Sequence, residues 1–212
     1  MIPLDPSGDF ASLADGLQAV SLVRRGRSGS DSIEHALRRS LGMREAAASN
    51  GQYTLTDVRW FLPKSECGAE PALGDAIVDA DGNRYAVLAV VGHDLTGLWE
   101  CTCRDLAIAH GLNDVITIEQ AVYAKGEGGA AVPAWHTLRT GIRARIQPLS
   151  STVEGGPDRR QTVNRFRIVV AEELSVDHTQ RIRAADGTIY RIIGSTGAGG
   201  IGQLQTLEAE SL

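Results

Sequence analysis

The chain has 212 residues, enough for one or two domains, and carries a formal net charge of −5, with 21 Lys and Arg against 26 Asp and Glu. This acidic balance argues against a protein that wraps nucleic acid with a basic surface. Aromatic residues are sparse at 5% and Gly is frequent at 24 residues, which favours many short strands joined by tight turns over a helical bundle.

Residues 1–14 are expected to form an N-terminal arm with at most a short helical turn. The alternating residues of Gly16–Val23 predict a half-buried strand, and the basic, Gly/Ser-rich stretch Arg24–Asp31 predicts an exposed loop. Apolar residues at helical spacing then follow an N-cap of Asp31 or Ser32, so this segment predicts the one short helix of the first half. Its buried face comprises Ile33, Ala36, Leu37, Ser40 and Leu41, and its end is expected near Gly42 or near Asn50-Gly51.

The rest of the first half reads as strands. Two apolar runs around Asp81-Gly82 predict a hairpin, because Gly accepts the positive φ of a tight turn. The expected strands are Thr54–Leu62, Ala76–Asp79, Arg84–Val91 and Leu98–Leu106.

The second half follows a linker, Ala107–Asn113, and again consists mainly of predicted strands separated by loops. Lys125–Val132 predicts a Gly/Ala loop, and Ser150–Arg160 predicts a mobile excursion between strands. The expected strands are Val115–Val122, Ile142–Leu149, Val163–Val170, Gln180–Ala184, Thr188–Ile193 and Gln203–Ala209.

An internal repeat organises the chain. Asp81–Leu88 returns as Asp186–Ile193, an offset of 105 residues, and the strands before and after it also have counterparts. The sequence therefore predicts a mainly β protein of two tandem small antiparallel β-barrel or sandwich modules, each with five to six strands. The first module is expected at residues 15–109 and the second at residues 113–212.

No combination of residues predicts a catalytic, cofactor-binding or metal site. Cys101 and Cys103 lie near His93 and His110, but zinc sites more often use Cys-x₂-Cys, and the aligned residues in the second copy are apolar. We therefore interpret both cysteines as core residues. The glycine-rich stretch Thr196–Gly202 has no Gly-Lys-Ser/Thr and precedes a strand pattern, so it predicts a hairpin loop and not a phosphate loop.

The odd cysteine count and the N-terminus, which has neither a basic start nor an apolar core, predict free thiols and synthesis in a reducing compartment. No apolar stretch approaches the roughly 20 residues of a membrane helix, so no membrane partner is expected.

Local basic clusters are the candidate interface residues. They could contact nucleic-acid phosphates, or they could belong to a solvated loop or form salt bridges to a neighbouring subunit; the acidic chain favours the latter two over nucleic acid. The residues are Arg24, Arg25, Arg27, Arg159 and Arg160. Six strand arginines also alternate with apolar residues and lie on one sheet face, where they could meet acidic groups of a partner. They are Arg143, Arg145, Arg165, Arg167, Arg181 and Arg183.

From about Asn113 to Leu212 the order of segments resembles the phage head–tail joining family, also called head-completion or stopper proteins. The resemblance rests on Val115–Ile118, on Trp135 before a strand that ends Arg145–Ser150, on Asn164–Val170 and on Asp186–Gly194. It implies small β-barrels that assemble into rings between the portal or adaptor of a filled capsid and the tail, hold packaged DNA in, and have no enzymatic activity.

The chain departs from this family pattern by being doubled. In the first copy, Leu37–Gly42 takes the place of Ile146–Leu149. The resemblance implies a homo-oligomeric six-fold or twelve-fold ring in the virion, assembled in the host cytoplasm, with a portal or adaptor protein above and a tail or tail-terminator protein below. A tail terminator, a ligand-binding or enzymatic β-barrel, and a cellular scaffold remain alternatives.

Overall fold

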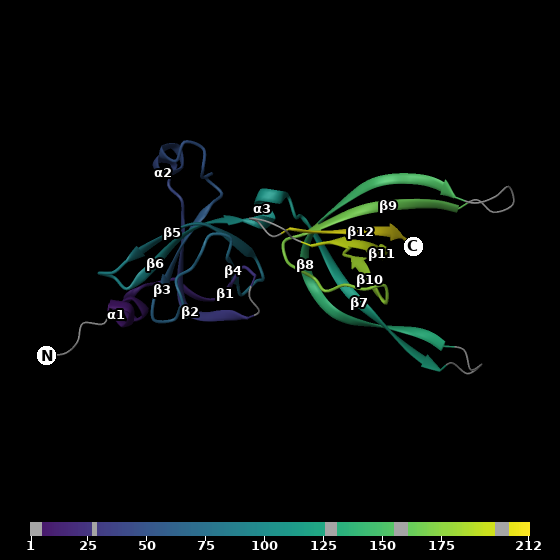
Figure 1. Cartoon of the computed structure of the whole chain (residues 1–212), viewed down its shortest axis with the longest axis horizontal. Coiled ribbons are helices and arrows are strands. Elements are labelled where there is room, and N and C mark those ends of the chain that lie inside the picture. The colour runs from purple at the N-terminus through teal and green to yellow at the C-terminus, as the bar shows by residue number, and fades with distance from the viewer. Residues whose placement is uncertain (1–5, 27–28, 126–130, 155–160, 198–203) are drawn as a thin grey trace. The chain divides into compact units, whose positions relative to one another are not determined.

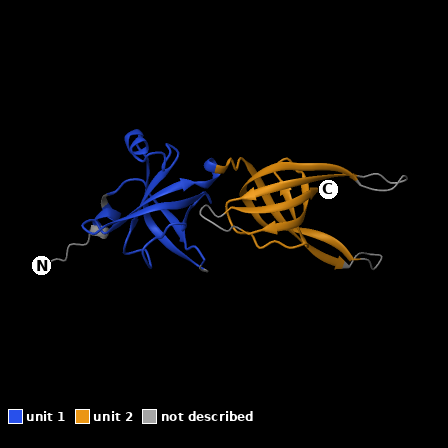
Figure 2. Cartoon of the chain, turned by 45° about the horizontal axis from the view of Figure 1, so that its top comes forward, with its two compact units in different colours: residues 1–109, 200–202 blue, residues 110–199, 203–212 orange. Residues whose placement is uncertain are grey.

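The computed structural model describes residues 6–26, 29–125, 131–154, 161–197 and 204–212. The chain divides into two compact units, unit 1 up to Ala109 and unit 2 from His110 (Figure 2). Each unit is a six-stranded antiparallel sheet closed into a barrel, so the mainly β fold predicted from the sequence is confirmed. No helix in the described ranges is long and apolar enough to span a membrane.

Unit 1 forms its barrel from six strands in the order β1-β2-β3-β6-β5-β4, and β4 pairs back with β1 (Figure 1). The strands are β1 (Leu17–Val23), β2 (Ser30–Ser40), β3 (Val58–Pro63), β4 (Ala76–Asp79), β5 (Arg84–His93) and β6 (Leu98–Asp105). The described helices of this half are α1 (Pro6–Leu13) and α2 (Met43–Ala48), and α3 (Leu106–His110) follows β6.

Unit 2 repeats this topology strand for strand, in the order β7-β8-β9-β12-β11-β10, with β10 closing onto β7. The strands are β7 (Asp114–Lys125), β8 (Ala131–Glu154), β9 (Gln161–Val170), β10 (Gln180–Ala184), β11 (Ile189–Thr196) and β12 (Gln205–Ser211). In both units the fourth and fifth strands meet at the predicted Asp-Gly turn, where Gly82 has φ 80° and Gly187 has φ 88°.

The two cores also correspond. Trp60 on β3 meets Tyr85 on β5 edge to face with ring centroids 5.4 Å apart, and Phe166 on β9 meets Tyr190 on β11 in the same way at 5.0 Å. Cys101 fills a fully buried core position, as the comparison of the two copies predicted. The same pattern of large apolar residues therefore closes both barrels.

The helix predicted over residues 31–41 is wrong, because residues 31–40 belong to strand β2. The Cα register pairs Val20 with Ile33 but Gln18 with Ala36, so β2 contains one extra residue between these pairs. Such a β-bulge turns both Ile33 and Ala36 toward the core, and their spacing of three imitates a helical face. Asp31 is not an N-cap, since its carboxylate binds Arg24. The helix of this region is the short α2, which begins later, at Met43.

Two predicted loops of unit 2 are shorter than expected because the strands continue into them. Strand β8 is 24 residues long, pairing with β7 over its first half and with β9 over its second. The predicted loop 125–132 therefore begins and ends in paired strand, and the excursion predicted from Ser150 remains paired as far as Glu154.

Candidate assembly surfaces

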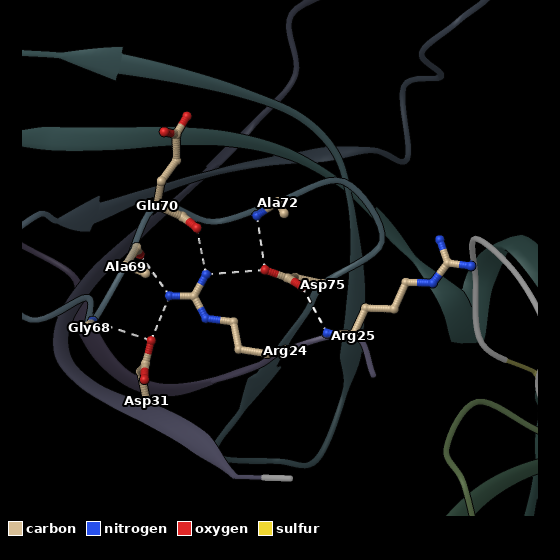
Figure 3. A network of polar contacts seen from close by, with 8 residues as sticks. All are labelled: Arg24, Arg25, Asp31, Gly68, Ala69, Glu70, Ala72 and Asp75. Carbon is tan, nitrogen blue, oxygen red and sulfur yellow. Dashed lines mark hydrogen bonds and ion pairs between the residues drawn. The ribbon is translucent and has the colours of Figure 1, made fainter. Parts of the chain in front are cut away.

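Arg24 directly follows β1, and its guanidinium joins three other segments of unit 1 (Figure 3). Nη2 donates to Asp31 Oδ2 and to the carbonyl oxygen of Ala69, both at 2.7 Å. Nη1 donates to the carbonyl oxygen of Glu70 at 2.7 Å and to Asp75 Oδ2 at 3.2 Å. A planar guanidinium suits this arrangement, since its N–H groups point in fixed directions.

The carboxylate of Asp75 lies at the centre of the same network. Its side chain is only 5% exposed and accepts further hydrogen bonds from the backbone N–H groups of Arg25 at 2.8 Å and Ala72 at 2.9 Å. Burial acts to lower the pKa of Arg24, but the hydrogen bonds and charges of Asp31 and Asp75 outweigh it and raise that pKa. Arg24 is thus an internal anchor that fixes residues 68–75 against β1 and β2.

The other predicted interface arginines are placed differently. Arg25 is exposed, and its side chain points away from the network around Arg24 (Figure 3). Arg27, Arg159 and Arg160 lie outside the described residues. The two adjacent arginines therefore have different roles: Arg24 binds groups within its own unit, whereas the side chain of Arg25 is exposed to solvent.

Three strand arginines of unit 2, Arg165, Arg181 and Arg183, have acidic partners within their own chain. Glu119 on β7 and Glu210 on β12 each bind two arginines across neighbouring strands, a favourable arrangement in antiparallel sheets. The ion pairs are Arg181–Glu119 at 2.7 Å, Arg183–Glu119 at 2.9 Å, Arg165–Glu210 at 3.3 Å and Arg191–Glu210.

The cysteines and histidines do not form a reactive centre in the described ranges. Burial raises the pKa of the Cys101 thiol to about 12, and the Cys103 pKa is also raised well above its usual value. His93 pairs with Glu100, Nε2 to Oε2 at 2.8 Å. No group of three or more His, Cys, Asp or Glu residues able to hold a metal ion occurs among the residues described. After residues 198–203, which are not described, the chain enters strand β12, as predicted.

Two hairpin arms extend from one end of the unit 2 barrel (Figures 1 and 2). We define the first arm as Ala121–Ala124 of β7 with Val132–Trp135 of β8, and the second arm as Ser150–Val153 of β8 with Thr162–Arg165 of β9. The first arm was not predicted from the sequence, because the glycine-rich stretch at its tip suggested only a loop. Its signal was the absence of charge from Ala121–Ala124 and from Ala131–Trp135.

The first arm exposes an unusual amount of apolar surface. Tyr123 is 63% exposed, Val132 54% and Val122 49%. None of the arm residues belongs to the hydrophobic core cluster of unit 2. An isolated two-stranded hairpin is only marginally stable in water, and contiguous exposed apolar residues are characteristic of interaction sites.

Comparison with known proteins matches the second half of the chain to one family. Residues 109–212 match the family described as phage head completion protein, which confirms the predicted resemblance over these residues. A solved structure titled "Virion of native gene transfer agent (GTA) particle" matches with 20% sequence identity and a TM-score of 0.38, covering 47% of this chain and 94% of that one. No curated protein matches the chain.

Proposed function

We propose that this chain, whose second unit matches the phage head completion family, is a structural virion protein that forms a ring in the neck of a tailed phage. The ring joins the DNA-filled head to the tail and helps to retain the packaged DNA. The observation that carries this proposal is the match over residues 109–212, which spans every strand of the unit 2 barrel.

The shape of the units supports an assembly role. A closed barrel has no free sheet edge in its wall, so subunit contacts are left to projecting segments such as the two arms and the loop that carries Arg25. Head-to-tail contacts repeated by rotation close into a ring. The partners on either side are a portal or adaptor protein and a tail or tail-terminator protein.

The net charge of −5 suits a channel that DNA must pass. Like charge weakens phosphate binding, and the strand arginines of unit 2 that would offer positive charge are partly neutralised by Glu119 and Glu210. The equivalent topology of the two units further suggests a tandem duplication, with modules at about residues 15–109 and 113–212.

Addition of the purified chain to tail-less, DNA-filled capsids tests this function. We expect negative-stain density at the capsid vertex and a fall in the fraction of packaged DNA that nuclease can digest. Capsids whose neck is already complete are the control and should take up no further protein. Density at the ends of free tails, with none on capsids, would favour a tail terminator, and binding to neither would refute the neck role.

A further inference from the structure

The first arm is a ribbon with two apolar faces. Side chains of directly opposed residues lie on the same face of an antiparallel pair, and successive residues alternate between faces. Val122 opposes Ala134 and Ala124 opposes Val132, so these four residues form one entirely aliphatic face. The other face carries Tyr123 opposite Pro133 and Ala121 opposite Trp135.

The aliphatic face continues the core-facing side of the barrel. Ile116 and Ile118 of β7 point into the core, and the same alternation along β7 leads to Val122 and Ala124. Beyond the barrel end, however, the described chain provides no core for these residues to join, and Val122, Ala124, Val132 and Ala134 are all exposed. This face of the arm therefore resembles a hydrophobic core surface, but no other part of the described chain packs against it.

The base of the arm is fixed to the barrel through its other face. The Arg181 guanidinium lies 4.0 Å from the ring centroid of Trp135, and its Nε is 2.7 Å from Glu119 Oε2. The Glu119 side chain is only 7% exposed, so this contact is shielded from water. These interactions hold the ribbon in place before any partner arrives and leave the aliphatic face open.

The free edge of β8 in this arm is unsuited to strand addition. Ala121 N–H points away from β8, because it donates to the Thr179 carbonyl at 3.0 Å. Ala121 pairs with Trp135, so the backbone nitrogen of Trp135 points away from β7 as well. The nitrogen of Pro133, two residues earlier on β8, points the same way, and proline has no N–H to offer an added strand. Strand addition at this edge of β8 is therefore disfavoured.

We propose that the aliphatic face of the first arm packs against a second copy of this chain. This inference rests on the proposed ring, in which each copy has neighbours of its own kind. Charge favours such a contact: residues 1–109 hold 15 Asp and Glu against 10 Lys and Arg, whereas residues 110–212 hold 11 of each. Unit 2 and its uncharged arm therefore approach a neighbour without net repulsion, while two copies of unit 1 repel each other.

The double variant Val122→Glu/Val132→Glu tests the contact in the full-length chain. Both side chains are about half exposed in the single chain, so the variant should fold like the wild type, which the thermal midpoint checks. Burial of two unpaired carboxylates at an interface should weaken self-association by about tenfold or more, measured by sedimentation velocity across a concentration series. Met43→Glu/Leu95→Glu is the matched control, since Met43 is 75% and Leu95 92% exposed in unit 1, outside both arms, and this variant should leave self-association unchanged.

A photo-crosslinking residue at Val132 provides a second measurement. We expect an adduct of two chains from the purified protein and from assembled particles. Self-association of the double variant equal to that of the wild type, or no two-chain adduct in either sample, would overturn the proposal. Wild-type protein that binds the capsid vertex without any two-chain adduct would retain the proposed function and refute this contact, whereas failure to bind capsids would remove the function itself.

Discussion

Substitution of Arg24 tests whether this residue anchors unit 1 or serves a partner. Arg24→Ala removes four hydrogen bonds at once, two of them to carboxylates. Its side chain is 13% exposed and that of Asp75 only 5%, so this pair lies between a surface salt bridge, worth about 0–1 kcal/mol, and a buried one, whose disruption costs about 3–5 kcal/mol. Asp75 keeps two backbone N–H donors, which lowers the cost. We expect a loss of about 2–3 kcal/mol.

Urea unfolding followed by tryptophan fluorescence in a Trp135→Phe background measures this loss, because the two remaining tryptophans, Trp60 and Trp99, both lie in unit 1. Arg25→Ala is the matched control, because Arg25 is exposed, and its unfolding free energy should stay within about 0.5 kcal/mol of the wild type. Arg24→Lys should fall between the two, since an ammonium keeps the charge but not the planar fork. Equal stability of Arg24→Ala and Arg25→Ala would show that the network contributes nothing and refute the reasoning.

Three further predictions follow from buried and strained groups. Burial raises the pKa of Cys101 to about 12, so its thiolate fraction at pH 8 is about a thousandfold below that of an ordinary thiol. Mass spectrometry should therefore find Cys101 alkylated only when the protein is unfolded in urea. Rapid labelling of the native protein would contradict its core position. Burial acts to raise the pKa of Asp57, but hydrogen bonds, chiefly from Arg104, outweigh it and lower that pKa. The ionised Asp57 therefore stabilises the fold at pH values above its unfolded-state pKa of 3.8, and this contribution is lost as the pH falls through its lower folded-state pKa. The unfolding free energies of wild type and Asp57→Asn should consequently converge below about pH 4. A difference that stays constant with pH would refute the assignment. Gly187→Ala should cost about 1–2 kcal/mol, because Gly187 has φ 88° although space is open around it. Gly197→Ala, also in open space but without a positive φ, should be nearly neutral; urea unfolding followed by far-UV circular dichroism, which reports both barrels, measures both variants, and equal losses would exclude the backbone explanation.

The sequence was most informative where local chemistry and the repeat agreed. Asp186-Gly187 specifies a tight turn by itself, and its match to Asp81-Gly82 aligns the strands on either side. The same alignment correctly assigned Cys101 to the core, because an apolar residue takes the equivalent place in unit 2. Both conclusions depend on residues close in sequence or on comparison within the chain, and neither requires knowledge of tertiary contacts.

The errors arose where distant residues decide the outcome. The periodicity of Ile33 and Ala36 fits a helix, and only the register with β1 shows that a bulge produces it. Arg24 looked like a solvated loop residue, because its buried partner Asp75 lies 51 residues away in the chain. Likewise, Glu119 is separated by 62 residues from Arg181, so the pairing of the strand arginines within the chain was invisible from the sequence.

The two units also indicate which features belong to the fold and which to function. The second strand of each unit, β2 or β8, contains a bulge where it pairs with the first strand. The fifth strand of each unit is also bulged, after Val87 in β5 and after Ile192 in β11. These two positions are 105 residues apart, which is the offset of the sequence repeat. Features kept in both copies are those that barrel closure requires, since a bulge bends a strand and redirects its side chains. The long strand β8 and its two arms have no counterpart in β2, which has only 11 residues. Unit 1 closes its barrel without arms, so barrel stability does not explain them, and the apolar face of the first arm is best explained by a contact that forms only on assembly.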